Sequence, residues 1–343
     1  MPNATTTAGQ RWSVRSLPSA LAQHERLERD VRDGLAQRPP TIPPRWFYDE
    51  KGAALFDDIT RLPEYYPTRS ETEILRARGR RVAEVTEAST LVEFGSGTST
   101  KTRILIDALT ARDRPLTFVP LDVSVEVLTE AARTLAGDYP TLTVEALVAD
   151  FEDPLPRLPG AGGHRLVAFL GGTIGNFTPA QRRDFLSRVR AALDPGDHLL
   201  LGADLIKDTG RLEAAYDDDA GVTAAFNRNV IEVLSRELHA EGLAPDDFDH
   251  VARWNEHEHR IEMWLRARVA VNARFPTLGL SWSLAAGDEV LTEISTKFTV
   301  PQLRHELRSL DFEPVESWTD PAGDFALILA RVRSSSHGFI RPK

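Results

Sequence analysis

The sequence predicts an α/β protein built on a doubly wound, mostly parallel sheet, with an additional lobe. Two observations support this fold class. Between residues 90 and 203, short apolar runs alternate with amphipathic segments, which is the pattern of strands joined by crossover helices. The alternation lapses after Leu205 and resumes only at Pro301, so the intervening segment is assigned to a second lobe. A chain of 343 residues is long enough for both parts.

The predicted sheet has five strands, and a helix with two further strands completes it. The five apolar runs cover residues 90–94, 118–121, 142–148, 165–170 and 198–203. Helices are expected at 100–109, 125–135 and 179–193, and the chain ends with a helix at 301–310 and strands at 313–318 and 325–332. This ending, with the last strand antiparallel to the others, resembles that of class I methyltransferases and differs from that of ordinary dinucleotide-binding domains.

The segment before the sheet has fewer regular features. Residues 17–37 carry apolar positions at helical spacing, which predicts a surface helix. Residues 45–69 crowd six aromatic side chains into a stretch with few signs of a regular element. A capping box formed by Ser70 and Glu73 predicts the start of a helix that ends near Val85.

Composition and charge exclude several classes of function. Acidic residues outnumber basic ones by 51 to 41, so the net charge of −10 repels phosphate backbones and argues against nucleic-acid binding. The lack of cysteine excludes disulfides and thiolate nucleophiles. No signal peptide or apolar run of membrane-spanning length is visible. We expect a cytoplasmic monomer that acts on a small molecule, with residues 1–15 disordered and residues 334–343 a flexible tail.

A candidate cofactor site follows the first predicted strand, because open α/β sheets bind ligands at the carboxyl ends of their strands. The turn Gly95-Ser96-Gly97 lets the backbone approach a ligand, and the next helix presents its first N–H groups there. A dinucleotide-binding pattern needs a third glycine where Thr100 stands. The turn therefore favours a nucleoside without pyrophosphate, such as S-adenosylmethionine, over the alternative of a purely structural turn.

Residues at the next strand ends extend this site. Asp122 ends the second strand, where a carboxylate can accept hydrogen bonds from two ribose hydroxyls; the alternative is a helix N-cap. Asp150 and Phe151 follow the third strand, where they can contact the amino group and the face of adenine; the alternative is a turn residue. Lys101 opposes the dipole of its helix, so we expect it to meet the cofactor's carboxylate.

Five motifs resemble the histidine-specific methyltransferases of ergothioneine biosynthesis, and the likeness runs from about residue 40 to residue 333. They are Trp46-Phe47-Tyr48-Asp49, Leu62-Pro63-Glu64-Tyr65-Tyr66-Pro67-Thr68-Arg69, Gly171-Gly172-Thr173-Ile174-Gly175-Asn176, Ala224-Ala225-Phe226-Asn227-Arg228-Asn229 and Leu291-Thr292-Glu293-Ile294-Ser295. The resemblance implies a class I, Rossmann-like enzyme that converts L-histidine to its Nα-trimethyl betaine, hercynine, in three successive transfers from S-adenosylmethionine. It implies cofactor contacts at Gly95, Lys101, Asp122, Asp150 and Phe151.

For the substrate, the resemblance implies contacts at Tyr65, Asn176, Tyr216, Glu293, Ile294 and Ser295. The first three would hold the amine and carboxylate end, and Glu293 with Ser295 would hold the imidazole ring. These two residues are two apart in a strand-like run, so they share a face and can address two ring nitrogens. The alternative is an exposed strand face. Further candidates are Tyr48, Phe56, Gly171 and Met263, for which core packing is the alternative.

The two parts of the chain are predicted to divide the work. Residues 16–68 and 207–296 would form a substrate-binding domain, and residues 69–206 and 297–333 an S-adenosylmethionine-binding domain. Methyl transfer from a sulfonium mainly requires an unprotonated amine in line with the S–CH₃ bond. No general base is evident; Tyr65 is the candidate catalytic residue, and loss of the proton to water is the alternative.

Three rival functions stay open at this point. One is methylation of tryptophan or another amino acid by the same fold, with Met263, Glu293 and Ser295 as the discriminating residues. Another is a nicotinamide-dependent oxidoreductase, and the third is a binding module that senses the cofactor. The run Glu256-His257-Glu258-His259 resembles a metal cluster, but no further ligands stand nearby at zinc-site spacing, so we expect a solvated turn and no metal.

Overall fold

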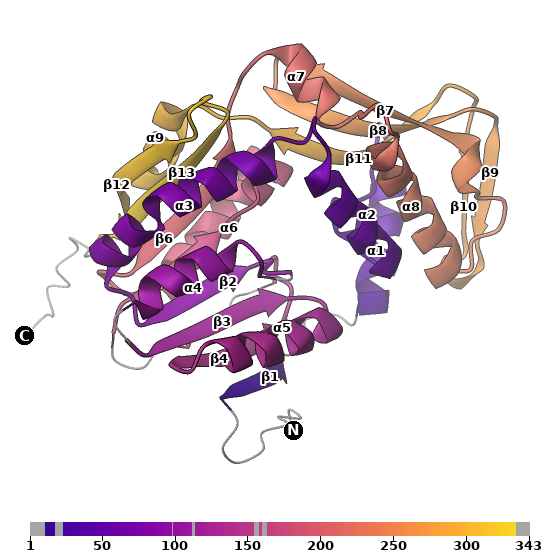
Figure 1. Cartoon of the computed structure of the whole chain (residues 1–343). Helices are drawn as coiled ribbons and strands as arrows, with labels where there is room; N and C mark the ends of the chain where they lie inside the picture. The colour runs from indigo at the N-terminus through magenta and orange to yellow at the C-terminus, as the bar shows by residue number, and fades with distance from the viewer. Residues whose placement is uncertain are drawn as a thin grey trace, which may run out of the picture.

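An eight-stranded sheet forms the centre of one lobe in the computed structural model, which describes residues 11–17, 23–97, 99–111, 114–153, 158–159 and 163–333 (Figure 1). The strand order is β1-β4-β3-β2-β5-β6-β13-β12. The strands are β1 (Trp12–Ser16), β2 (Thr90–Phe94), β3 (Leu116–Asp122), β4 (Leu142–Val148), β5 (Arg165–Phe169), β6 (His198–Asp204), β12 (Phe312–Thr319) and β13 (Phe325–Val332).

The sheet is parallel from β1 to β6, and β13 pairs with β6 in the antiparallel sense, so the predicted topology is confirmed. The strand order reverses between β2 and β5, which lie side by side. This reversal is the topological switch point, where the carboxyl ends of the strands leave room for a ligand. The turns after β2 and β5 therefore emerge next to each other.

Helices cover both faces of the sheet, which is why its central strands are buried and mainly apolar. One face carries α3 (Pro67–Thr86), α4 (Thr102–Thr110) and α5 (Val125–Asp138). The other face carries α6 (Pro179–Ala192) and α9 (Val300–Ser309). All five residues of β2 are buried between these layers, so the turn that follows β2 starts from a fixed point.

A second lobe is built mainly from antiparallel strands. Its three-stranded sheet has the order β11-β8-β7, with β7 (Phe248–Asn255), β8 (Arg260–Ala267) and β11 (Glu289–Thr296). Beside it lie the hairpin of β9 (Val271–Phe275) and β10 (Leu280–Leu284), the helices α7 (Thr209–Ala214) and α8 (Val222–Glu237), and the 3₁₀ turns η3 (Pro245–Asp247) and η4 (Pro276–Leu278).

The N-terminal helices belong to this second lobe although they precede the large sheet in the sequence. Figure 1 shows α1 (Gln23–Leu35) and α2 (Glu50–Arg61), in indigo, against the orange strands and α8. With η1 (Pro44–Phe47) they share one hydrophobic core, whose members lie between Leu27 and Tyr66 and between Leu212 and Val290. The exact boundaries of the two domains stay a prediction.

The expectation of disorder over residues 1–15 is wrong for its last part. Trp12 to Ser16 form β1, which pairs in parallel with β4. Trp12 and Val14 alternate with polar residues and pack against the core, a period of two that the polar composition concealed. The helix predicted from residue 17 is described only from Gln23, and residues 1–10, 18–22 and 334–343 lie outside the described part of the chain.

The predicted irregularity of residues 45–69 is also wrong, since η1, α2 and the start of α3 lie there. Helix α3 begins at Pro67, so Ser70 is a buried residue of its interior and not an N-cap. Proline at the first helical position has its backbone angle already set for a helix, and it starts the helix one turn earlier. Among the described helices, none combines the length and apolarity needed to cross a membrane.

Candidate active site

The turn after β2 has the conformation that its glycines predict. Gly95 and Gly97 have positive φ angles of 66° and 48°, which residues with a side chain rarely adopt. The Gly97 N–H donates to Asp122 Oδ2 at 2.9 Å, so the turn is tied to the end of β3. Ser124, and not Asp122, caps α5. The N-cap alternative for Asp122 is therefore wrong.

The residues around this turn fit the adenosyl part of S-adenosylmethionine. The hydroxyls of Ser96 and Ser99 are buried and have no hydrogen-bond partner among the described residues. A side-chain carbon placed on Gly95 would lie 3.5 Å from the ring of Phe151, so the ring stands directly beside the turn. Unpaired hydroxyls, a carboxylate and an aromatic ring at one sheet edge suit a ligand with ribose and purine groups.

Asp150 is more heavily engaged than the sequence suggested. Its Oδ2 accepts hydrogen bonds from Arg26 and from Arg45, each at 2.8 Å, and its Oδ1 accepts from the Glu152 N–H at 2.8 Å. Asp150 is therefore partly a turn residue, which was the alternative to a cofactor contact. Arg26 comes from α1 and Arg45 from η1, so Asp150 links the second lobe to the cofactor edge of the sheet.

Lys101 is held by a residue that the sequence reading overlooked. Its ammonium pairs with the carboxylate of Glu71, which is fully buried in α3 and also accepts the Gly171 N–H at 2.9 Å. Gly202 makes room for this carboxylate, because a side-chain carbon there would lie 2.2 Å from Glu71 Oε1. The capping box expected at Ser70 and Glu73 gave no sign of a role for Glu71.

The predicted imidazole-binding pair lies on one face of β11. In the antiparallel ladder Glu293 is opposite Met263 of β8, and Ser295 is opposite Ile261. Glu293, Met263 and Ser295 therefore face the same side, as predicted. Ile294 lies between Glu293 and Ser295, and alternation directs its side chain to the opposite face. Only its backbone is placed to approach a ligand at the pair.

A glycine brings the turn after β5 close to this face. The turn contains Gly171 and the 3₁₀ helix η2 (Thr173–Asn176), and the Asn176 side chain lies near enough to Glu293 to lower the pKa of its carboxyl. A side-chain carbon on Gly175 would lie only 2.7 Å from the Thr296 carbonyl oxygen. The absence of a side chain at Gly175 thus lets the cofactor domain deliver Asn176 to the second lobe.

Tyr216 lies between α7 and α8 and joins the pair from another side. Its hydroxyl is 2.8 Å from Ser295 Oγ. Both hydroxyls contact Lys297, whose ammonium forms an ion pair with Asp204 at the end of β6. Sequence reasoning missed both charged residues. Lys297 continues the every-second-residue spacing of Glu293 and Ser295, and this spacing could have identified it.

An aromatic cluster lies beside the same residues. The rings of Tyr48 and Phe56 are 5.5 and 5.9 Å from Phe226 of α8, and Tyr65 is 6.3 Å from Tyr216. Tyr65 is buried, whereas Tyr48 is 44% exposed. Phe226 belongs to one of the five family-like motifs but is not among the predicted site residues. Its central position supports the predicted grouping of aromatic faces.

Burial controls the protonation of this region. It raises the pKa of Glu293 to about 7, against the lowering effects of Lys297 and Asn176. Burial, Tyr216 and Glu293 raise the pKa of Tyr65 well above its usual range, and burial, Asp204 and Glu293 do the same for Tyr216. Both phenols are therefore neutral near neutral pH, and Glu293 is poised between its two forms.

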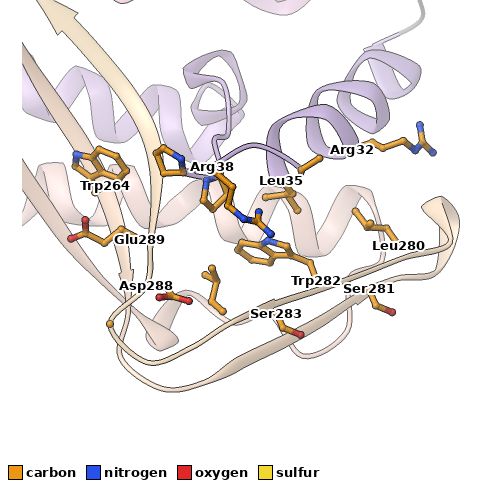
Figure 2. Close-up of a pocket in the computed structure, with 15 residues that line it drawn as sticks. Arg32, Leu35, Arg38, Trp264, Leu280, Ser281, Trp282, Ser283, Asp288 and Glu289 are labelled. Atoms are coloured by element: carbon orange, nitrogen blue, oxygen red, sulfur yellow. The ribbon is translucent and has the colours of Figure 1, made fainter. Parts of the chain in front are cut away.

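Two other features lie away from this site. Residues 256–259 form the exposed turn between β7 and β8, as expected, and no group of three or more potential metal-ligating side chains is found in the described ranges. A surface pocket of about 840 Å³ lies between α1 and the β9–β10 hairpin (Figure 2). Trp264 and Trp282 line it, and none of the predicted site residues does.

The sheet order, the glycine turn at its switch point and the adjoining lobe define the class as a Rossmann-like methyltransferase. The family described as "Histidine-specific methyltransferase, SAM-dependent", where SAM is S-adenosylmethionine, matches residues 27–332. The chain belongs to this family of enzymes.

Relatives of known name agree with the family match. The "Histidine N-alpha-methyltransferase" of Mycolicibacterium smegmatis is 54% identical over 93% of this chain and 98% of the relative. That of Mycobacterium tuberculosis is 52% identical over 90% of this chain and 96% of the relative. "Ergothioneine biosynthesis protein 1" of Neurospora crassa is 31% identical over 62% of this chain and 24% of that longer protein.

Proposed function

We propose that this enzyme transfers three methyl groups successively from S-adenosylmethionine to the α-amine of L-histidine, giving hercynine in ergothioneine biosynthesis. One observation carries the choice of substrate: Glu293 and Ser295 share a face of β11 opposite Met263, beside Asn176 and Tyr216. A carboxylate and a hydroxyl at this spacing match the two nitrogens of an imidazole. A ring without nitrogens would leave both groups unpaired, which opposes its binding.

The cofactor edge would hold S-adenosylmethionine through five residues. Gly95 gives the close backbone approach, Asp122 accepts from the ribose hydroxyls, and Asp150 with Phe151 addresses the adenine. Lys101 would serve the carboxylate of the methionyl part, with Glu71 fixing its position. When bound, S-adenosylmethionine supplies an electrophilic methyl group, which the amine lone pair takes as S-adenosylhomocysteine forms and the amine loses a proton.

The chain's own contribution is mainly positioning. Glu293 and Ser295 fix the ring, while Asn176, Tyr216 and Tyr65 would orient the amine and carboxylate end. The raised pKa of Tyr65 keeps its hydroxyl protonated, so it suits a hydrogen-bond donor and not a base. Of the two routes that the sequence left open for the amine proton, this favours its loss to water over its transfer to Tyr65. Tyr48, Phe56 and Tyr65 would offer aromatic faces to the growing ammonium, at about 0.5 to 2 kcal/mol per contact.

The test is a direct assay of substrate choice. The protein is incubated with S-adenosylmethionine and each common amino acid in turn, and product masses are recorded. The proposal expects histidine alone to gain one, two and then three methyl groups. Methylation of tryptophan or another amino acid in preference to histidine would support the rival substrate assignment. Cofactor binding without any methyl transfer would favour a sensing module.

A further inference from the structure

Lys297, directly after β11, stands out among the buried charged residues because it is placed against the predicted imidazole site. Its side chain is fully buried, and the ion pair between Lys297 Nζ and Asp204 Oδ2 spans 2.8 Å. Its ammonium also lies 2.9 Å from the Tyr216 hydroxyl and 2.8 Å from Ser295 Oγ. An ammonium has three N–H donors and no acceptor, so these three contacts use all of its hydrogen-bonding capacity.

This arrangement restricts where the protons of the two hydroxyls can point. Tyr216 and Ser295 each accept a hydrogen bond from Lys297, and their oxygens are 2.8 Å apart, so one hydroxyl donates to the other. A phenol is the more acidic hydroxyl and hence the better donor, which favours donation from Tyr216 to Ser295. The oxygen of Ser295 then accepts from both neighbours, and its own proton must point away from them.

We propose that Lys297 is a positioning residue for the neutral imidazole ring: by occupying the oxygens of Tyr216 and Ser295, it makes Ser295 a donor to the unprotonated ring nitrogen. Glu293 accepts from the protonated nitrogen on the same strand face. This inference rests on the proposed function, since it concerns how histidine is recognised. Lys297 would thereby control which nitrogen of the bound imidazole carries the proton and keep the ring uncharged. Glu293 and Ser295 alone do not supply this control.

A second lysine separates this role from simple support of the fold. Lys207 also pairs with Asp204, and its ammonium contacts the Tyr66 hydroxyl at 2.7 Å. It is nearly as buried as Lys297, yet none of its hydrogen bonds goes to Tyr216 or Ser295. Replacing either lysine by methionine removes one cation from Asp204 and leaves the other in place. Only the change at Lys297 frees the two site hydroxyls.

The experiment compares Lys297→Met with Lys207→Met in the full chain. Calorimetry measures binding of S-adenosylmethionine and then of histidine. We expect Lys297→Met to weaken histidine binding about 10- to 100-fold, in line with the loss of charge-assisted hydrogen bonding, with cofactor affinity retained. Lys207→Met should change histidine affinity less than about threefold, which is the size expected for a change that disturbs only the surroundings of the site. Equal losses in both variants would overturn the positioning role.

A double-mutant cycle tests whether Lys297 acts through Ser295. In a Ser295→Ala background, Lys297→Met should cost much less histidine affinity than it costs in the unaltered enzyme, because the oriented donor is already gone. Additive losses would show that Lys297 acts elsewhere. If the unaltered enzyme does not bind histidine at all, the proposed function fails instead, so the two failures are distinguishable.

A measurement on the unaltered enzyme covers the case in which Lys297→Met does not fold. Histidine labelled with a heavy nitrogen isotope in its ring is bound to the protein at neutral pH and observed by NMR. The proposal expects one protonated nitrogen and one unprotonated nitrogen that accepts a hydrogen bond. Two protonated nitrogens in the bound ring would contradict it, because an imidazolium has no site for the proton of Ser295.

Discussion

At the cofactor edge each predicted residue follows its own strand, whereas in the second lobe the predicted residues come from segments far apart in the sequence. Gly95 and Asp150 follow β2 and β4, and Asp122 ends β3; the carboxyl ends of these strands meet at one edge. Glu293 and Ser295 share their site with Tyr216 and Asn176, which β-alternation alone does not place there. The cofactor side of the site depends on the arrangement of strands in the sheet. The substrate side depends on how the two lobes pack.

The largest effect is expected at the cofactor edge, with Asp122→Ala. It removes the predicted ribose acceptor and leaves the N–H groups of Gly97 and Ser124 unpaired. Loss of about two charge-assisted hydrogen bonds should weaken S-adenosylmethionine binding by about 100-fold or more. Calorimetry on Asp122→Ala and on the milder Asp122→Asn, which keeps an acceptor for Gly97, measures this. Unchanged cofactor affinity in Asp122→Ala would remove this residue from the site.

The second lobe should respond through the other ligand. Glu293→Ala is expected to weaken histidine binding about 30- to 100-fold, because the imidazole N–H then loses a buried, charged acceptor. Cofactor affinity should be spared. Glu289→Ala is the matched control, since Glu289 lies on the same strand but pairs with Arg253 and Arg266 at the lobe's surface. A similar loss of histidine affinity in the control would mean that β11 as a whole, and not Glu293, was disturbed.

The pH dependence separates the two regions further. With its pKa raised to about 7, Glu293 loses its charge as the pH falls through 7, so histidine affinity should drop by up to about tenfold per pH unit below it. In the ligand-free enzyme, the stability of the fold changes with pH in the opposite direction. The folded protein binds the proton more tightly than the unfolded chain does, so this residue stabilises the fold increasingly as the pH falls from 7 toward 4.5.

Calorimetry and thermal unfolding across this pH range check both trends. Glu293→Gln should remove its contribution to each and leave only the titration of histidine itself in the binding curve. A variant with the same pH profile as the unaltered enzyme would show that another group titrates.

The contact between the lobes can be probed at Gly175. A methyl group there would meet the Thr296 carbonyl, and the overpacking should push η2 away from β11 and raise the KM for histidine about 5- to 10-fold. Binding of S-adenosylmethionine should change little. Gly137→Ala is the control, since nothing lies within 4 Å of the added carbon in α5. If Gly175→Ala leaves the KM unaltered, the close approach is not needed for histidine binding.

The smallest effect is expected where the two regions are joined by ion pairs. Arg45→Ala removes one of the two guanidinium groups from Asp150, while Arg26 stays in place. We expect cofactor affinity to fall about threefold, the scale of a partly exposed ion pair. Arg61→Ala, which affects only ion pairs within α2, should have no effect. Titrating histidine with and without cofactor shows whether Arg45→Ala also weakens the coupling between the ligands.

Local rules determined most of the cofactor half of the protein. Apolar runs bounded by turns marked β2, β4 and β13 with the ends that the structure has. The same rules failed where tertiary packing or chain stereochemistry prevailed. Pro67 starts α3 ahead of the expected cap at Ser70, and Trp12 to Ser16 form a strand only because β4 offers an open edge.

The sequence by itself determined seven of the eight strands of the sheet, the glycine turn and the shared face of Glu293 and Ser295, because each depends on residues within a few positions of one another. Only the tertiary structure decided that Glu71 holds Lys101 and that Lys297 joins Tyr216 to Ser295. Buried charges need partners, and those partners are supplied by whichever segment packs nearest in space. The spacing of a charged residue on its own strand does not identify such a partner, which can lie far along the chain, as Asp204 lies 93 residues before Lys297.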